Sequence, residues 1–481
     1  RVDYNRVFKD RHEVTAMLLA NRGNRTVNNE LAYHSQGITG RFAYYYNQKY
    51  LMEFNCGYNG SENFAPGKRY GFFPAGSIGW VISEEPFMKK ASWIDFLKVR
   101  ASYGLVGSDN VSSRFPYLAF YGGGSGYHFG NNFGTEVGGT SEGNLANENL
   151  TWEKARKLNV GIDFTTLNQR LALTVDAFYE YRFDIITDMN GDGIMGYPDI
   201  VGKDAALQNL GEVSNRGVDV ELSWNDKIGK DFRYWAGINL SYNQNEIIER
   251  KEAPQEYDYL YQKGHRIGSR KQYAFWRYYD EQTPALYEQT FHRPFPTHSV
   301  VLQDGDAVYV DLNGDRKIDE NDMGYDYGFT DDPEYMIGLN LGFSWKNWEV
   351  NTQWTGAWNV SRMISDVFRQ PFVSSAGSNA GGLLSYHLDH TWTPENPSQS
   401  AEYPRATQVN ASNNYATSTL FEKDAKYLRL KTLQVAYNFQ FPLMKKLGLT
   451  TCQLAFSGYN LLTFSPYLWG DPEATASNAP T

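Results

Sequence analysis

Residues 218–225 read Val-Asp-Val-Glu-Leu-Ser-Trp-Asn, with an apolar side chain at each even position and a polar one at each odd position. Successive side chains of a β-strand point to opposite faces, so this alternation predicts a strand with one apolar and one wet face. The same pattern returns in residues 238–243, 339–345 and 433–440. Repeated alternating segments of about ten residues are typical of a transmembrane β-barrel.

The composition narrows the classes of protein that this chain can belong to. The mean hydropathy is −0.56, and no apolar run approaches the ~18 residues of a membrane helix, which excludes a helical membrane protein. The net charge is −10, whereas the negative phosphate backbone of a nucleic acid binds positively charged proteins. We therefore predict no nucleic-acid partner. The aromatic content of 16% suits the girdles that barrels place at the two membrane surfaces.

Short and long connections separate the segments that we expect to be strands. The short connections include residues 47–49 and 346–347, and the long ones are residues 106–151, 184–213, 246–334 and 359–426. Outer-membrane barrels have short periplasmic turns and long extracellular loops. We therefore predict an all-β fold, a transmembrane antiparallel β-barrel in contact with outer-membrane lipid. Its strands should lie at residues 12–20, 41–47, 50–58, 76–83, 96–104, 158–164, 171–181, 217–225, 234–243, 337–345, 348–358, 427–441 and 450–458.

Six segments carry a more specific signal. They are residues 70–80 (Tyr-Gly-Phe-Phe-Pro-Ala-Gly-Ser-Ile-Gly-Trp), 93–107, 150–154 (Leu-Thr-Trp-Glu-Lys), 209–217 (Asn-Leu-Gly-Glu-Val-Ser-Asn-Arg-Gly), 427–431 (Tyr-Leu-Arg-Leu-Lys) and 458–473. In this order they resemble the SusC/RagA family of TonB-dependent outer-membrane transporters. The resemblance extends from about residue 1 to residue 473.

The resemblance implies both an architecture and a function. Residues 1–481 would form the C-terminal portion of a plugged barrel of about 22 strands, with the plug domain and the TonB box upstream. The protein would import glycan oligosaccharides or peptides across the outer membrane in complex with a SusD-like surface lipoprotein. TonB, acting through the missing N-terminal part, would supply the energy. The resemblance implies no enzymatic activity and no organic cofactor.

An acidic stretch at residues 311–322 is the sharpest local motif. Twelve residues, Asp-Leu-Asn-Gly-Asp-Arg-Lys-Ile-Asp-Glu-Asn-Asp, space oxygen ligands as a short Ca²⁺-binding loop does. Arg316 replaces the usual Gly of the sharp turn, and Asp322 is shorter than the usual Glu. The alternative is an acidic surface turn, because Asn, Gly and Asp are ordinary turn formers. The candidate ligands for a structural Ca²⁺ are Asp311, Asn313, Asp315, the carbonyl of Lys317, Asp319 and Asp322.

Other motifs give weaker signals. Residues 188–199 partly repeat the acidic pattern, but Gly196 supplies no ligand, which favours a plain turn. The glycine-rich run at residues 122–126 has no phosphate-binding context and is expected to be a flexible aromatic loop. No zinc motif or nucleophile elbow is present, so we predict no catalytic residues. Loop aromatics could contact a ligand or pack together: Tyr257, Tyr259, Tyr261, Trp276, Tyr278, Tyr279 and Trp392.

The sequence is also compatible with two other classes of protein. One is a passive, porin-like barrel that is complete in itself. The other is a soluble carbohydrate-active β-protein, for which the sequence offers little beyond the neighbouring carboxylates Glu84 and Glu85. Adjacent side chains of an extended segment point in opposite directions, so these two carboxylates make a poor catalytic pair.

Overall fold

The structure is a computed structural model that describes residues 1–26, 31–130, 136–143, 145–191, 193–364, 366–372, 382–439 and 448–474. The chain divides into two compact units, Arg1–Pro254 and Gln255–Thr481, and we describe each by itself. Among the described residues, no helix is long and apolar enough to cross a membrane.

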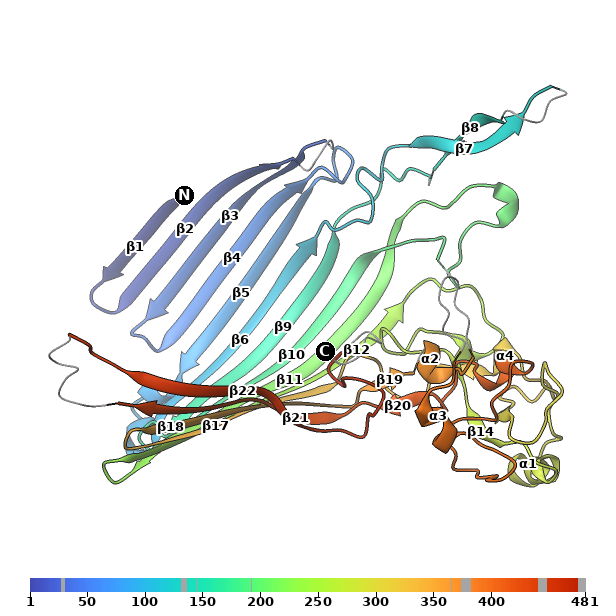
Figure 1. Cartoon of the computed structure of the whole chain (residues 1–481). Helices are drawn as coiled ribbons and strands as arrows, with labels where there is room; N and C mark the ends of the chain where they lie inside the picture. The colour runs from blue at the N-terminus through green and yellow to red at the C-terminus, as the bar shows by residue number, and fades with distance from the viewer. Residues whose placement is uncertain are drawn as a thin grey trace. The chain divides into compact units, whose positions relative to one another are not determined.

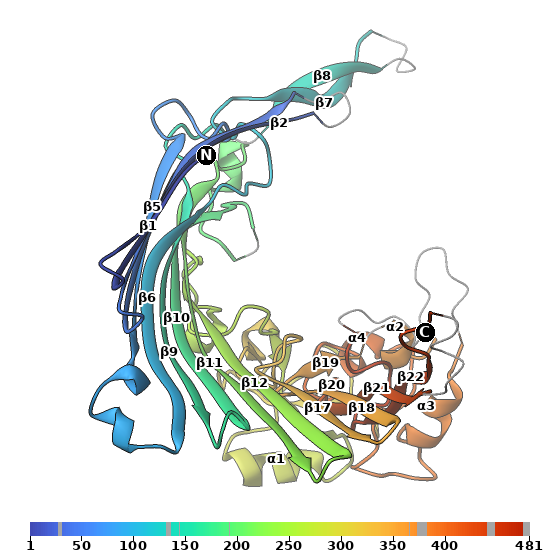
Figure 2. The same ribbon diagram turned by 90° about the vertical axis from the view of Figure 1, so that its left-hand side faces the viewer.

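The first unit is built on a curved antiparallel sheet in which most strands pair with their neighbours along the chain (Figures 1 and 2). The order β1-β2-β3-β4-β5-β6-β9-β10-β11-β12 skips only the separate hairpin β7–β8. Most of these strands exceed the ~9–11 residues that cross a membrane. Their bounds are β1 Val2–Phe8, β2 His12–Arg25, β3 Tyr33–Tyr46, β4 Tyr50–Ser61, β5 Tyr70–Val81, β6 Ile94–Ser108, β9 Glu153–Thr166, β10 Leu171–Thr187, β11 Gln208–Ile228 and β12 Phe232–Glu249.

The register of this sheet sorts its side chains into two faces. Met52 of β4 lies opposite Ile78 of β5, and Ile78 lies opposite Ala101 of β6. Ala101 in turn pairs with Val160 of β9, so one apolar row runs across four strands. Most of these side chains are exposed in spite of being apolar. An exposed apolar face of this extent is what a bilayer covers, and we call it the outer face.

Short turns join the strands at one end of the first unit. Residues 9–11, 47–49, 167–170 and 229–231 make these turns. Asn47 and Gln48 both have positive φ, 53° and 58°, which matches the right-handed twist of the paired strands. Longer connections lie at the other end, and the largest carries β7 Tyr121–His128 and β8 Glu136–Glu142, which project beyond the sheet (Figure 1). This is the asymmetry of an outer-membrane barrel.

The second unit joins four antiparallel strands to a folded loop region. The strands pair in the order β17 Tyr335–Trp345, β18 Trp348–Trp358, β21 Tyr427–Asn438 and β22 Gln453–Phe464. The loop region has its own core, which includes Tyr278, Tyr403 and Phe421. Its elements are η4 Asp258–Leu260, β13 Gln272–Tyr273, β14 Phe275–Tyr278, α1 Thr283–Phe291, β15 Ala307–Tyr309, η5 Glu320–Asp322, β16 Met323–Gly324, β19 Ser361–Met363, α2 Asp366–Arg369, α3 Ser385–His390, α4 Ala411–Asn414 and β20 Glu422–Asp424.

The sequence predicted these antiparallel strands with one omission, and it assigned one further segment wrongly. Strand β1 was not expected, although it pairs with β2 from Val2 to Phe8. The glycine-rich run at residues 122–126 is not an irregular loop but part of β7, which pairs with β8. Cross-strand hydrogen bonds need no side chains, so a strand pair can form where glycine hides the alternation. The predicted end of the strand at residues 427–441 falls partly outside the described residues.

Candidate functional site: the inner polar face and an acidic loop

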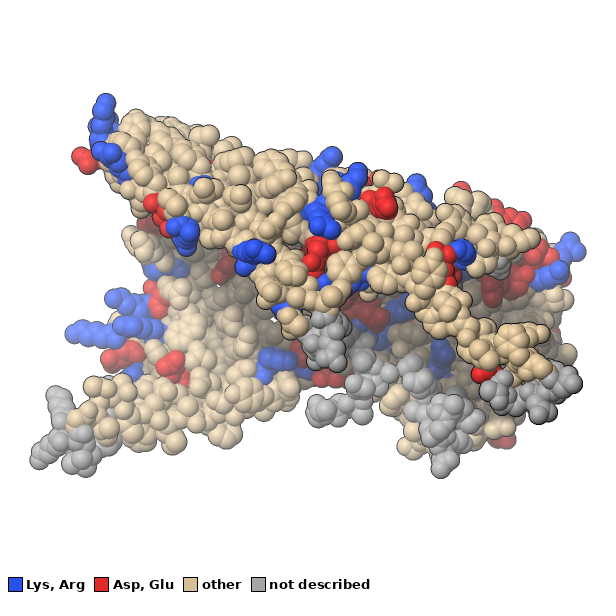
Figure 3. Space-filling view, turned by 90° about the horizontal axis from the view of Figure 1, so that it is seen from above, with Lys and Arg blue, Asp and Glu red and all other residues tan. Residues whose placement is uncertain are grey.

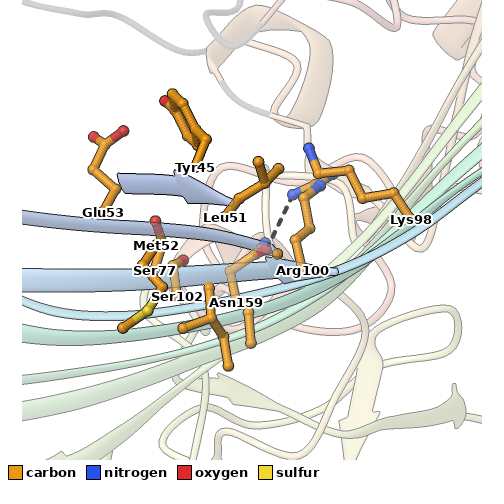
Figure 4. Close-up of a pocket in the computed structure, with 12 residues that line it drawn as sticks. Tyr45, Leu51, Met52, Glu53, Ser77, Lys98, Arg100, Ser102 and Asn159 are labelled. Carbon is orange, nitrogen blue, oxygen red and sulfur yellow. Dashed lines mark hydrogen bonds between the residues drawn. The ribbon is translucent and has the colours of Figure 1, made fainter. Parts of the chain in front are cut away.

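The face of the first unit opposite the outer face is polar, and we call it the inner face. Figure 4 shows Tyr45, Glu53, Lys98 and Arg100 on one side of the strands and Met52 on the other. Alternate residues of β3, β4 and β6 therefore supply this wall, as the sequence alternation requires. The inner face is the surface that a solute inside the barrel would meet.

Arg100 is the centre of the charge arrangement on the inner face. Its Nη1 and Nη2 donate to the two carboxylate oxygens of Asp176 at 2.7 and 2.6 Å. Its Nε donates to Asp163 at 3.3 Å, and Nη1 reaches Asn159 at 3.5 Å. A two-pronged arginine–carboxylate pair is among the stronger and more directional hydrogen-bonded pairs. These hydrogen bonds fix the orientation of the Arg100 guanidinium.

A glycine makes the contact between Arg100 and Asp176 possible, although these residues lie on strands that are not adjacent. Arg100 and Asp176 belong to β6 and β10, and β9 lies between these strands. Gly161 of β9 is paired with both residues. A Cβ at Gly161 would come within 2.6 Å of Arg100 Cζ and 2.7 Å of Asp176 Oδ1. Because Gly161 has no side chain, the Arg100 and Asp176 side chains can meet over strand β9.

Neighbouring charges on the inner face are also paired. Arg41 Nη2 contacts Glu53 at 2.6 Å, and Asn55 donates to the same carboxylate at 2.8 Å. Lys98 lies 3.8 Å from Asp163. A hollow of about 270 Å³ opens among Tyr45, Leu51, Glu53, Ser77, Lys98, Arg100, Ser102 and Asn159, with Met52, Ile78, Gly79 and Ala101 completing its lining (Figure 4). Its hydroxyl, amide and charged groups can hydrogen-bond a polar solute.

Acidic and basic side chains are also intermixed on the surface that Figure 3 draws. Blue and red residues stand singly or in small groups between broad uncharged areas. Mixed charges of this kind create no large field of one sign, so they favour recognition by local hydrogen bonds over long-range attraction.

The acidic loop at residues 311–322 folds as one closed turn in the second unit. Asp311 accepts hydrogen bonds from the backbone N–H of Gly314 at 2.6 Å and of Arg316 at 3.0 Å. Asp322 accepts from the backbone N–H of Leu312 at 2.8 Å and of Asp319 at 2.9 Å, which joins the two ends of the loop. Asn313, Asp315 and Asp319 each accept from the N–H two residues further on.

The donor chemistry of this loop suits a hard cation, but its carboxylates already have backbone partners. Asp322 is fully buried, and burial raises the pKa of its carboxyl to about 6. Within the described part of the chain, no three His, Cys, Asp or Glu side chains are grouped so that they could hold a metal ion. Calcium at Asp311, Asn313, Asp315, Lys317, Asp319 and Asp322 therefore stays a prediction from ligand type and spacing.

The second acidic match forms a turn where it is described. Asp188 accepts from the N–H of Asn190 at 3.0 Å, and Asn190 Nδ2 donates to the carbonyl of Ala205 at 3.0 Å. Asp192 lies outside the described residues. These local bonds agree with the plain-turn interpretation.

The loop aromatics serve mainly as packing residues. Tyr278 and Trp392 are buried members of the loop-region core. Trp276 packs edge-on against Tyr287 and Phe291, at 5.2 and 5.4 Å between ring centroids. Tyr257 and Tyr259 stack on each other at 5.5 Å, and the Tyr259 hydroxyl donates to the Asn321 carbonyl at 2.7 Å. The hydrogen bond of Tyr259 thus connects the stacked tyrosine pair to the acidic loop.

Sequence reasoning did not single out the inner-face charges. The alternation marked Arg100, Asp163 and Asp176 only as polar positions of three strands. Oppositely charged residues at inward positions of successive strands are the signal that could have found them.

Comparison with known proteins agrees with the two-faced sheet. The family model for the TonB dependent receptor-like β-barrel matches residues 3–461. This chain belongs to that family. TonB-dependent receptor barrels are outer-membrane proteins, so the outer face is the lipid-facing surface and the inner face lines the barrel lumen.

The chain is also similar to individual TonB-dependent receptors, SusC among them. It is 27% identical to TonB-dependent receptor P3 of Formosa agariphila, over 92% of this chain and 42% of that protein. It is 26% identical to TonB-dependent receptor SusC of Bacteroides thetaiotaomicron, over 83% of this chain and 37% of that protein. The resemblance to the SusC/RagA family is thereby confirmed.

A solved structure supports the same fold. The RagAB peptide importer in the closed-closed state aligns with a TM-score of 0.74 and 20% identity, over 99% of this chain and 52% of that chain. The chain therefore spans about half the length, or less, of the relatives that it matches.

Proposed function

We propose that this barrel portion works in TonB-dependent import of glycan oligosaccharides or peptides across the outer membrane. The observation that carries the proposal is the two-faced sheet in a chain of the TonB-dependent receptor family. Its outer face is apolar, and its inner face offers paired charges, hydroxyls and amides. Such a wall holds polar solutes by many exchangeable hydrogen bonds and releases them again.

The partners follow from the same family. A SusD-like surface lipoprotein would capture the substrate above the long-loop end, and TonB would act through a plug encoded outside these residues. SusC and the RagAB importer are the relatives that support this assembly. The protein's role is transport, and we assign no covalent chemistry to any residue.

Uptake by cells tests the function and separates the two substrate classes. Cells with and without the full-length receptor are given fluorescent oligosaccharides in one experiment and fluorescent peptides in another. We expect receptor-dependent accumulation of one class, which is lost when TonB is deleted. Accumulation that persists without TonB would favour the porin-like alternative. Hydrolysis of the labelled oligosaccharide by the purified receptor would favour the carbohydrate-active alternative.

We also propose a structural Ca²⁺ in the acidic loop. Support comes from the oxygen ligands at residues 311, 313, 315, 317, 319 and 322 and from the closed course of the loop. The ion would neutralise a cluster of carboxylates and fix the loop against Tyr259.

A further inference from the structure

The connection between β5 and β6 differs from the other turns at the short-turn end. It spans residues 82–93, whereas the turns around it have three or four residues. It forms two single-turn helices, η1 Ile82–Glu84 and η2 Met88–Lys90. Figure 2 shows this blue segment bulging from the bottom of the sheet on its convex side. The neighbouring turns show that three or four residues are enough to join two adjacent strands, so the additional residues of this connection are not needed for the turn itself.

The connection is fixed to the outer face rather than to the lumen. The Trp93 ring packs edge-on against Phe164 at 6.1 Å between centroids. Phe164 lies in the same alternating row of β9 as Ile162 and Val160, which belong to the outer face. The hydroxyl of Thr166 donates to the Trp93 carbonyl, which holds the end of the connection on β9. The connection is thus continuous with the lipid-facing surface.

An aromatic belt leads from this surface to the connection. Tyr50 and Trp80 pair across β4 and β5 on the outer face. The Tyr50 hydroxyl donates to Glu85 at 2.7 Å, and the Trp80 indole N–H donates to it at 3.2 Å. Tyr and Trp prefer the membrane–water boundary, where the ring is apolar and the polar tip is wet. Their tips mark the level at which the hydrocarbon ends.

The connection itself presents two exposed aromatic rings and two exposed cations. Phe87 is 62% exposed and Trp93 is 61% exposed. Lys89 and Lys90 are also exposed at the end of η2. Glu85 is held by Tyr50, Trp80 and Lys49, the last at 3.6 Å, which leaves Glu84 as the exposed carboxylate of the connection. Aromatic rings beside lysines are the composition of segments that lie in the membrane interface.

We propose that residues 82–93 form a phospholipid-binding anchor in the periplasmic leaflet of the outer membrane. Phe87 and Trp93 insert at the boundary between headgroups and acyl chains. Lys89 and Lys90 contact the lipid phosphates, as long cationic side chains do when their stems lie along apolar surface. The inference rests on the membrane position of the barrel and not on the cargo, so failure of the transport proposal leaves it standing.

A depth measurement on the full-length receptor tests the anchor. Cys56 and Cys452 are free and are first replaced by serine, and an environment-sensitive fluorophore is then attached to Phe87→Cys. Lys230→Cys, in the short turn between β11 and β12, is the matched control because it is exposed at the same end of the sheet. Receptors in phospholipid nanodiscs are quenched by headgroup-labelled nitroxide lipid and, separately, by aqueous iodide.

The two quenchers give a clear decision. We expect at least twofold stronger lipid quenching at position 87 than at position 230, with weaker iodide quenching. Equal quenching at the two positions would place the connection in water and overturn the proposal. Protection from both quenchers would indicate a protein partner and would also overturn it.

Charge reversal tests the lysines independently. The variant Lys89→Glu/Lys90→Glu should lower the enrichment of spin-labelled phosphatidylglycerol around the receptor by about fivefold per lysine near the surface. The control Lys230→Glu should leave the enrichment unchanged. Unchanged enrichment in the double variant would remove the lysines from the proposed site.

Discussion

Arg100 on β6 and Asp176 on β10 form a two-pronged ion pair at 2.7 and 2.6 Å across a strand that separates them. The pair exists because Gly161 of β9 leaves its inner-face position empty. Three adjacent strands are therefore joined by side chains as well as by backbone hydrogen bonds. The charged groups that face the lumen also hold the wall together.

Filling this space should weaken the barrel wall. Gly161→Val places carbon atoms where the Arg100 guanidinium and the Asp176 carboxylate now lie. We expect a loss of about 1 kcal/mol from the broken ion pair, since part-exposed pairs contribute little more than this. Thermal denaturation of the full-length receptor in detergent measures the change. Gly76→Ala is the control, because its nearest neighbour would be 3.9 Å away; equal melting of both variants would contradict the prediction.

Asp306 should be essential for the loop region of the second unit. It is fully buried and receives hydrogen bonds from Arg405 at 2.9 Å, Asn410 at 2.6 Å and Asn414 at 2.8 Å. Asp306→Ala leaves these buried donors and the Arg405 charge without a partner, which costs about 3–5 kcal/mol. Limited proteolysis of the full-length receptor should then cut the loop region much faster.

A nearby exposed carboxylate, Asp304, supplies the control for the proteolysis experiment. Asp304→Ala removes an exposed carboxylate two positions away and should leave the proteolysis rate unchanged. If both variants were cut at the same rate, the buried network would not be the source of the loop region's stability.

Calcium should stabilise the receptor through the acidic loop alone. Adding Ca²⁺ to metal-free receptor should raise the melting temperature, since a ligand that binds only the folded state shifts the equilibrium towards it. Asp311→Asn should abolish the rise. Asp188→Asn, in the plain turn of the second acidic match, should retain it. If the melting temperature did not change on addition of Ca²⁺, residues 311–322 would be an acidic surface turn without a bound ion.

Acid should loosen the loop region through His298. Burial lowers the pKa of His298 to about 4, and its Nε2 accepts from the Tyr309 N–H at 3.4 Å. Between about pH 6.5 and 4, His298 is protonated in the unfolded chain but stays neutral in the folded chain. The free energy of unfolding therefore falls as the pH falls through this window. The hydrogen-exchange protection factors of residues 297–310, which are corrected for the slower intrinsic exchange in acid, should fall over that range. His298→Gln should flatten the response, and an equally steep response in this variant would assign the effect to another group.

The sequence by itself determined the sheets and their two faces. Alternation in residues 218–225 or 339–345 is a local signal, because the pleat of a strand sends neighbouring side chains in opposite directions. Turn residues such as Asn47 and the contrast between short and long connections likewise specified which end is which. Where glycine removes the alternation, as at residues 122–126, the local signal was lost and the strand was missed.

Only the tertiary structure decided which polar side chains meet. The contact of Arg100 with Asp176 depends on the register of three strands, and the partners of Asp306 come from residues about a hundred positions away. The outward course of residues 82–93 likewise depends on the packing of Trp93 against Phe164 on another strand. The periodicity of the sequence shows which face of the sheet a side chain occupies. A contact between strands also depends on which residues of the adjacent strand lie beside it, and this register is set only when the sheet folds.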